Sequence, residues 1–86
     1  METKAVLALG WQHTPKGFVK RFDFLDFKEA LSFINRVGDF SEAHQHHPEI
    51  INNYNLVRLR LWTHDTDSLT EKDVHWVLAF EKQDQH

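Results

Sequence analysis

The chain has 86 residues, a formal net charge of −3 at pH 7 and no cysteine. This length predicts one domain over residues 1–86, the lack of cysteine excludes disulfides and thiolate metal ligands, and the negative charge argues against a nucleic-acid partner. No apolar run reaches the ~20 residues that cross a bilayer, and residues 1–10 are too short and mixed for a secretory signal, so we expect a cytoplasmic protein without a membrane partner.

The chain begins with a predicted hairpin. Residues 1–10 carry only a weak pattern, compatible with a short helical turn or a disordered arm. The strand-like residues 11–13 and 18–24 flank residues 14–17, where a proline and a glycine two positions apart predict a turn. Apolar and polar residues alternate in the second strand, apart from Lys20, as in a half-buried antiparallel strand.

A helix is predicted after the hairpin. Asp26 and Glu29 have the spacing of a capping box. Apolar residues then recur at helical spacing over residues 27–44. Pro48 disfavours helical geometry at the residue before it, so the helix should end by residues 44–46.

The second half repeats this order. Residues 50–52 and 56–64 are predicted strands, and in the longer one alternate residues should face the helices, namely Val57, Leu59, Leu61 and Thr63. Ser68 and Glu71 have capping-box spacing and open a helix to about Lys82. Its apolar band is too broad for one face, so this helix should be covered on two sides or meet another subunit.

Together these elements predict an α+β fold of order ββαββα. Two hairpins, each followed by a helix, pack most economically as a four-stranded antiparallel sheet with helices on one face. The loops that join helices and strands would then carry the functional groups.

Histidines gather where the predicted elements end. Three of the seven, His44, His46 and His47, fall within four positions just before Pro48, and His64 ends the long strand. Imidazole can donate and accept protons and titrates near neutrality, so such a group suits proton transfer. The alternative is structural, because histidines at a helix C-terminus can also bind free carbonyls.

The spacing of these residues resembles that of the pterin-4a-carbinolamine dehydratase family. The family pattern is an acidic or polar residue, three spacers and His-His-Pro, followed by an aromatic residue, a histidine and an aspartate. The chain matches it without a gap at Glu42, His46, His47, Pro48, Tyr54, His64 and Asp73. Segments 63–65 and 69–73 resemble the family's Thr-His and Leu-Thr-Glu-(Lys/Arg)-Asp stretches, and Trp11 resembles the tryptophan of its first strand.

The resemblance implies a hydro-lyase. Family members dehydrate 4a-hydroxytetrahydrobiopterin to quinonoid dihydrobiopterin in tetrahydrobiopterin recycling, which needs an acid and a base but no metal and no redox cofactor. It therefore implies a pterin substrate, an aromatic amino acid hydroxylase as metabolic partner, and a homodimer or homotetramer. The small size also favours an oligomer, because a chain of this length buries only about 60% of its unfolded surface.

The resemblance also implies site residues. The implied catalytic residues are His47 and His64 for proton transfer, His46 to hold the ring, and Asp73 to fix an imidazole tautomer. The implied substrate-binding residues are Glu42, Gln45, Pro48, Trp62, Thr63 and Asp65. The chain departs from the family in three places: Gln45 often is Asn or Asp, Trp62 often is Ser or Thr, and only ten residues precede Trp11.

Two alternatives stay open at this point. His44, His47 and His64 could share a metal ion, since imidazoles three apart on a helix can ligate together, although no carboxylate is spaced as a fourth ligand. The chain could also be a non-catalytic dimerisation or assembly cofactor, as some relatives are. That role would use the helix over 69–80 or the sheet face with Arg58 and Arg60.

Overall fold

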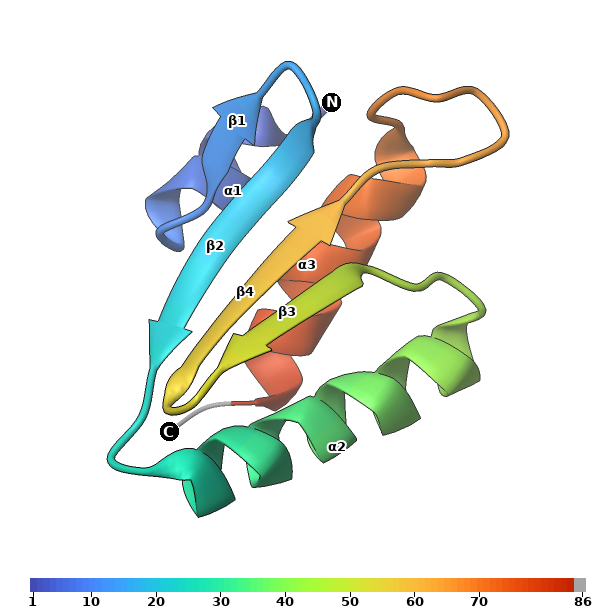
Figure 1. Ribbon diagram of the computed structural model, residues 1–86. Coiled ribbons are helices and arrows are strands. Elements are labelled where there is room, and N and C mark those ends of the chain that lie inside the picture. The colour runs from blue at the N-terminus through green and yellow to red at the C-terminus, as the bar shows by residue number, and fades with distance from the viewer. Residues whose placement is uncertain (85–86) are drawn as a thin grey trace.

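The computed structural model describes residues 1–84 and confirms the α+β class. Its elements are α1 (Thr3–Ala8), β1 (Gln12–Thr14), β2 (Gly17–Asp23), α2 (Phe27–His44), β3 (Glu49–Asn53), β4 (Leu56–Leu61) and α3 (Glu71–Gln83) (Figure 1). The predicted order ββαββα is confirmed, and residues 1–10 take the first of their two predicted forms, the short helix α1, which makes the full order αββαββα. This helix packs on α3 and buries Val6 completely, a tertiary contact that six residues of weak pattern do not reveal.

The sheet has the strand order β1-β2-β4-β3, with every neighbouring pair antiparallel. The β1–β2 turn lies where the sequence predicts it and depends on Gly17, whose φ is +123°. A Cβ atom at Gly17 would lie 2.2 Å from the Leu61 carbonyl oxygen, so the turn packs too closely on β4 for any larger residue.

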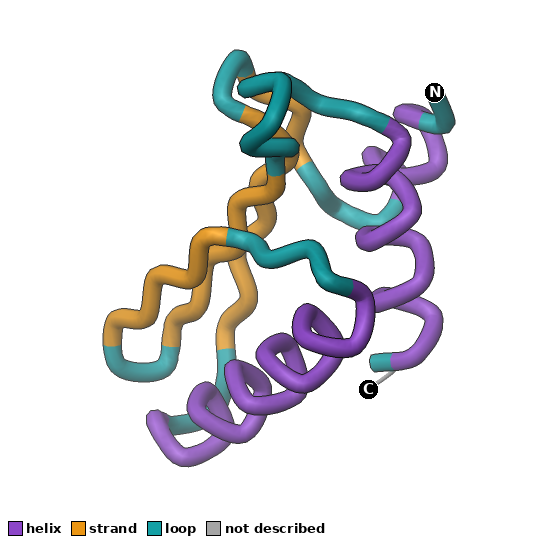
Figure 2. The backbone as a smooth tube through the Cα atoms, turned by 90° about the vertical axis from the view of Figure 1, so that its right-hand side faces the viewer, coloured by secondary structure: helices purple, strands orange, loops and turns teal. Residues whose placement is uncertain are grey.

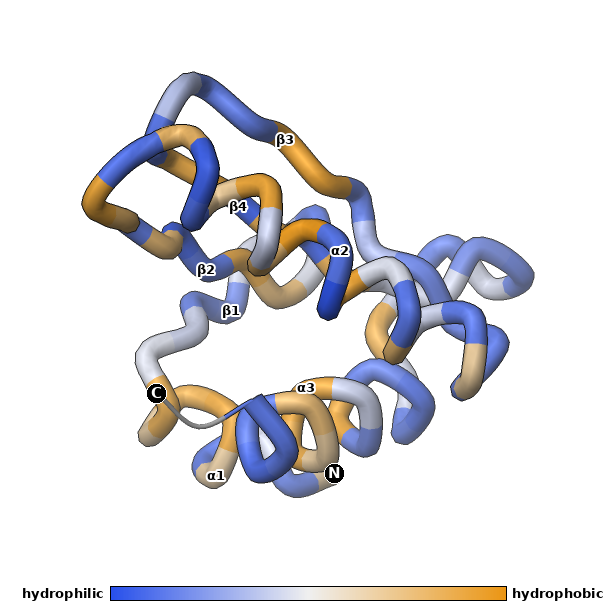
Figure 3. The backbone as a smooth tube through the Cα atoms, turned by 90° about the horizontal axis from the view of Figure 1, so that it is seen from below, coloured by the Kyte–Doolittle hydropathy of each residue, from blue (hydrophilic) through white to orange (hydrophobic). Residues whose placement is uncertain are grey.

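The helices cover one face of the sheet (Figure 2). Seen from below, the strands form one layer, α1 and α3 form the opposite one, and α2 closes the side between them (Figure 3). The predicted inward residues of β4 are confirmed, since Val57, Leu59 and Leu61 are fully buried. They pack with residues from both long helices in a single core that includes Phe33, Val37, Trp76, Val77 and Phe80.

The predicted start and end of α2 are confirmed. The Asp26 side chain accepts a hydrogen bond from the Glu29 backbone N–H at 2.9 Å, as an N-cap does. In a capping box the Glu29 carboxylate would accept from the N–H of the N-cap residue, Asp26. Here it accepts from the N–H of the preceding residue, Leu25. No helix within residues 1–84 is long and apolar enough to span a membrane.

The start of α3 differs from the prediction. The N-cap is Thr70, paired with Asp73, rather than Ser68 paired with Glu71. Ser68 cannot cap the helix because its backbone pairs with Thr63 in an isolated antiparallel bridge. For the same reason β4 ends at Leu61 and not at residue 64, since the chain there bends into the loop that this bridge closes.

The broad apolar band of α3 is explained within the chain. The helix packs against α2 and the rest of the core on one side and against α1 on the other, so it is covered on two sides, as one of the predicted alternatives required. Lys20, the exception on the inward face of β2, also finds partners there. Its Nζ donates to the Leu9 carbonyl and to Glu81 Oε2, both at 2.7 Å.

Candidate active site

The histidine-rich segment leaves α2 through a left-handed turn. Gln45 caps the helix with φ 52° and ψ 40°, and the backbone N–H groups of Gln45 and His46 both donate to the Ser41 carbonyl. This turn carries His46 to the first turn of α3, where it meets Asp73. His44 stays on the helix, with its ring stacked on Phe40 at 3.9 Å between centroids.

His46 is bound to a buried carboxylate. Its Nε2 lies 2.7 Å from Asp73 Oδ1, and the Asp73 side chain is 0% exposed. The other carboxylate oxygen accepts hydrogen bonds from Thr63 Oγ1 at 2.8 Å and from the Thr70 N–H at 2.9 Å. A carboxylate only accepts, so the hydrogen sits on Nε2 and neutral His46 keeps Nδ1 as an acceptor. Asp73 thus caps α3 and orients His46 with the same side chain.

His47 is bound to a second carboxylate, on the surface. Its Nε2 lies 2.5 Å from Glu42 Oε2, one helical turn earlier in α2. The two side chains are 53% and 75% exposed, so this pair holds the ring less firmly than Asp73 holds His46. The geometry again leaves Nδ1 of neutral His47 as the acceptor.

His64 is held differently. It is exposed, it lies in the loop after β4, and among residues 1–84 its imidazole has no hydrogen-bond partner. Its ring instead contacts Trp62, with 4.4 Å between ring centroids and 51° between ring planes.

The three histidines meet at one shallow pocket. Its volume is about 180 Å³, and it is lined by His46, His47, His64, Gln45, Thr63, Asp65 and Lys72. Six of these are predicted site residues. Lys72 was missed, although its position beside Asp73 in the first turn of α3 could have indicated it. Small-molecule sites are usually about 300–1,000 Å³, so this pocket alone is small for one. A neighbouring hollow of about 360 Å³ shares Gln45, His46 and Lys72 with it.

The remaining predicted site residues do not line this pocket. Glu42 and Asp73 lie behind His47 and His46 as their hydrogen-bond partners. Trp62 contacts His64 from the sheet side, and Pro48 is half-buried in the turn that follows. Within residues 1–84 no three His, Cys, Asp or Glu side chains are grouped to hold a metal ion, so the arrangement suggested for His44, His47 and His64 is not formed.

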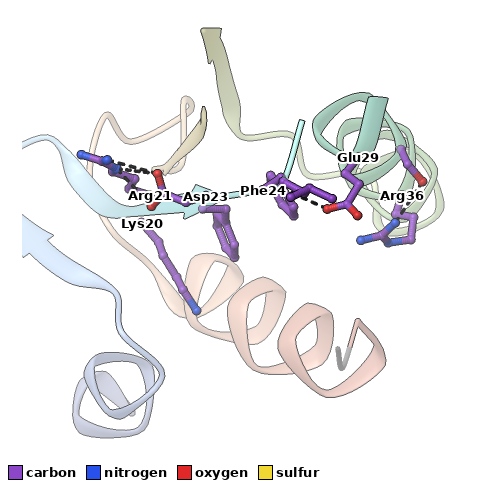
Figure 4. Close-up of a pocket in the computed structure, with 9 residues that line it drawn as sticks. Lys20, Arg21, Asp23, Phe24, Glu29 and Arg36 are labelled. Atoms are coloured by element: carbon purple, nitrogen blue, oxygen red, sulfur yellow. Dashed lines mark hydrogen bonds and ion pairs between the residues drawn. The ribbon is translucent and has the colours of Figure 1, made fainter. Parts of the chain in front are cut away.

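A larger hollow lies elsewhere and has no histidine. It occupies about 670 Å³ between the end of β2 and the first half of α2 (Figure 4). Figure 4 shows Lys20 pointing to one side of β2 while Arg21 pairs with Asp23, and it shows Glu29 and Arg36 on α2. Each of these charged groups is engaged by a neighbour within residues 1–84, so this hollow carries no acid or base poised for a substrate.

Comparisons with known proteins identify the family of this chain. Residues 1–83 match the protein-family model described as pterin 4 alpha carbinolamine dehydratase. A Thermomicrobium roseum protein named "Putative pterin-4-alpha-carbinolamine dehydratase" is 40% identical over 65 residues, which cover 76% of this chain and 70% of that protein. A Christiangramia forsetii protein of the same name is 40% identical over 72 residues, covering 84% and 74%.

A solved structure extends the likeness to three dimensions. The crystal structure of the transcriptional coactivator/pterin dehydratase from Brucella melitensis matches with a TM-score of 0.81 and 30% identity, covering 94% of this chain and 90% of that one. The family model covers nearly all of this chain, and the fold and the histidine spacing agree with it. The chain therefore belongs to the pterin-4a-carbinolamine dehydratase family and is a hydro-lyase of that family.

Proposed function

We propose that the protein dehydrates 4a-hydroxytetrahydrobiopterin to quinonoid dihydrobiopterin, and that its histidines act as general acid and base. The observation that supports this best is that His46, His47 and His64, from two separate segments of the chain, line one pocket. In the reaction the C4a–O bond breaks as the hydroxyl oxygen takes a proton and leaves as water. The N5–H proton goes to a base, and its electron pair forms the C4a=N5 bond.

The surroundings of the three imidazoles differ, and this difference supports separate roles for them. His46 is held by a buried carboxylate, so it is the group best fixed to hold the pterin ring. His47 and His64 are more exposed and are proposed as the proton-transfer groups. Such acid and base steps are each worth about 10²–10⁴-fold in rate, most when the group titrates near the working pH, as imidazole does.

Polar groups around the histidines are proposed to bind the pterin. Gln45 and Asp65 line the pocket and offer an amide and a carboxylate to the ring nitrogens and carbonyl. Thr63 also lines the pocket, but its hydroxyl donates to Asp73, so its proposed contact with the pterin is through packing. Glu42 and Asp73 act behind them by orienting His47 and His46. Lys72 adds a cation at the rim. Pro48 and Trp62 are not proposed to touch the substrate, because neither lines the pocket.

The alanine variants of His47 and His64 test this assignment. Each should reduce kcat by about 100-fold or more, since a proton-transfer step loses its catalyst, whereas the His46→Ala variant should chiefly raise KM. His13→Ala is the matched control, because His13 is an exposed histidine on β1 that contacts Phe18. Near-normal turnover in both the His47 and the His64 variants would reject the assignment.

The proposed setting is tetrahydrobiopterin recycling in the cytoplasm. There the protein serves an aromatic amino acid hydroxylase, which makes its substrate, and acts as a homodimer or homotetramer. Large apolar side chains left exposed on α2, Phe27 at 43% and Leu31 at 42%, support an oligomer. Light scattering of the purified protein tests this, and a monomer at all concentrations would contradict it.

The Brucella melitensis relative is titled both coactivator and pterin dehydratase, which favours one alternative role. A non-catalytic dimerisation or assembly cofactor would bind another protein through the sheet face with Arg58 and Arg60, because α3, the other surface considered, is covered on two sides. A dehydratase assay together with titration of an oxidised pterin separates the two roles. A chain that neither turns over the carbinolamine nor binds the pterin acts as a cofactor for another protein.

A further inference from the structure

Three side chains form a stack that leads along the outer face of the sheet to His64. The Arg60 guanidinium carbon lies 3.8 Å from the centroid of the Trp62 ring. The Trp62 ring lies 4.4 Å from the His64 ring, centroid to centroid. Arg60 alternates with the buried Leu59 and Leu61, so its side chain lies on the side of β4 that the helices leave uncovered. Trp62 and His64 continue from it along the chain just beyond the end of β4.

The far end of the stack is fixed at two points. Arg60 Nε and Nη2 donate to the two Glu49 carboxylate oxygens at 3.1 and 3.3 Å, across the β3–β4 pair. Its Nη1 donates to the Lys16 carbonyl in the β1–β2 turn at 3.1 Å. The hydrogen bond from Arg60 also lowers the pKa of Glu49. The guanidinium is thus held by the strand on one side and the turn on the other.

We infer that Arg60 and Trp62 position the His64 ring, and that Glu49 supports them by holding Arg60. His46 and His47 each have a carboxylate that fixes the ring, whereas the His64 ring has no hydrogen-bond partner within residues 1–84. The tilted contact with the Trp62 ring limits rotation of the His64 ring, and Arg60 fixes Trp62 by a cation–π contact. Both imidazole nitrogens stay free for the substrate.

The catalytic effect that we infer rests on the proposed function, whereas the arrangement of the side chains does not. If His64 transfers a proton, Arg60 affects catalysis through Trp62 without touching substrate. Loss of the stack should therefore lower kcat more than it raises KM. Misplacing a catalytic group by about 1 Å can cost about 10²-fold, and partial loss of orientation should cost about ten-fold.

The test combines proton NMR of the His64 ring with steady-state kinetics. A stacked tryptophan shifts the His64 ring protons upfield, and a His64→Gln spectrum assigns them. Arg60→Ala and Trp62→Leu should reduce this shift and lower kcat about ten-fold with KM nearly unchanged. Arg60→Lys and Trp62→Phe should recover part of both. Arg58→Ala is the control, because Arg58 is an exposed arginine on the same sheet face, two residues earlier.

The outcomes separate this inference from the proposed function. Unchanged His64 shifts in both Arg60→Ala and Trp62→Leu would overturn the stack. Altered shifts with unaltered kcat would overturn its catalytic role. A wild-type protein that shows the upfield shift but no dehydratase activity would reject the proposed function and uphold the stack.

Discussion

Replacing Asp73 by asparagine changes one charge at the centre of the site and almost nothing in shape. Asp73 Oδ2 accepts from Thr63 Oγ1 and from the Thr70 N–H, while Oδ1 faces His46 Nε2. Asparagine has a single acceptor oxygen, which the two donors should hold at the Oδ2 position. Its NH₂ group then faces His46, and because two N–H groups cannot bond to each other, His46 must move its proton from Nε2 to Nδ1.

The size of the effect follows from the type of hydrogen bond. A bond to a charged group contributes about 1.5–3 kcal/mol and a neutral one about 0.5–1.5 kcal/mol, so the substitution should cost about 1–2 kcal/mol. If that loss falls on substrate binding and turnover, kcat/KM decreases by about 5- to 30-fold. If it falls on folding, Tm decreases by about 4–8 °C for each kcal/mol in a domain of this size.

Three measurements distinguish these results. Dehydration kinetics give kcat/KM, nitrogen NMR of the imidazole gives the His46 tautomer, and thermal unfolding gives Tm. Glu71→Gln is the matched control, since Glu71 is a 74% exposed acid in the same first turn of α3. The reasoning is refuted if the Asp73→Asn protein keeps hydrogen on His46 Nε2 and its kcat/KM stays within about two-fold of wild type.

Three further predictions concern stability. Gly17→Ala should destabilise the fold by about 1–3 kcal/mol or more, because alanine is strained at the positive φ of this position. Gly38→Ala should stabilise α2 by about 0.5–1 kcal/mol, because the added Cβ would meet nothing within 4 Å apart from its chain neighbours and the helix's own backbone. Denaturant midpoints test both. Glu49→Gln should cost about 0.2–1 kcal/mol at neutral pH. Arg60 lowers the Glu49 pKa from its ordinary 4.5, so the difference from wild type is complete above that pH and vanishes as pH falls through the lowered pKa.

The parts of the fold that local pattern determines were predictable. The alternation in β4, the Asp26 cap of α2 and the end of that helix before Pro48 all follow from rules about neighbouring residues. The same holds for much of the site. Histidines next to predicted element ends do meet at one pocket, because the ends of α2, β4 and α3 lie together in the sheet-and-helix arrangement.

Tertiary contacts decide the parts of the structure that the sequence left open or predicted wrongly. Helix α1 is too short to form alone and depends on packing against α3. Thr70 replaces Ser68 as N-cap because Ser68 is already paired with Thr63 across a loop. Trp62, which the family resemblance implied as a substrate-binding residue, does not line the pocket of the histidines. It lies instead just beyond the end of β4, where it contacts His64.

The three imidazoles are held by three different means, and this difference bears on their roles. His46 is 14% exposed and bound to a carboxylate that also caps α3, so its ring cannot turn without disturbing the helix start. His47 is bound to an exposed glutamate, and His64 only to an aromatic face. A group that holds a ring benefits from rigidity, whereas a group that gives or takes a proton must keep a nitrogen free for the substrate. Of the three histidines that line the pocket, only His64 keeps both nitrogens free of hydrogen bonds within residues 1–84, so it is the one best suited to both take a proton and return one within a turnover cycle.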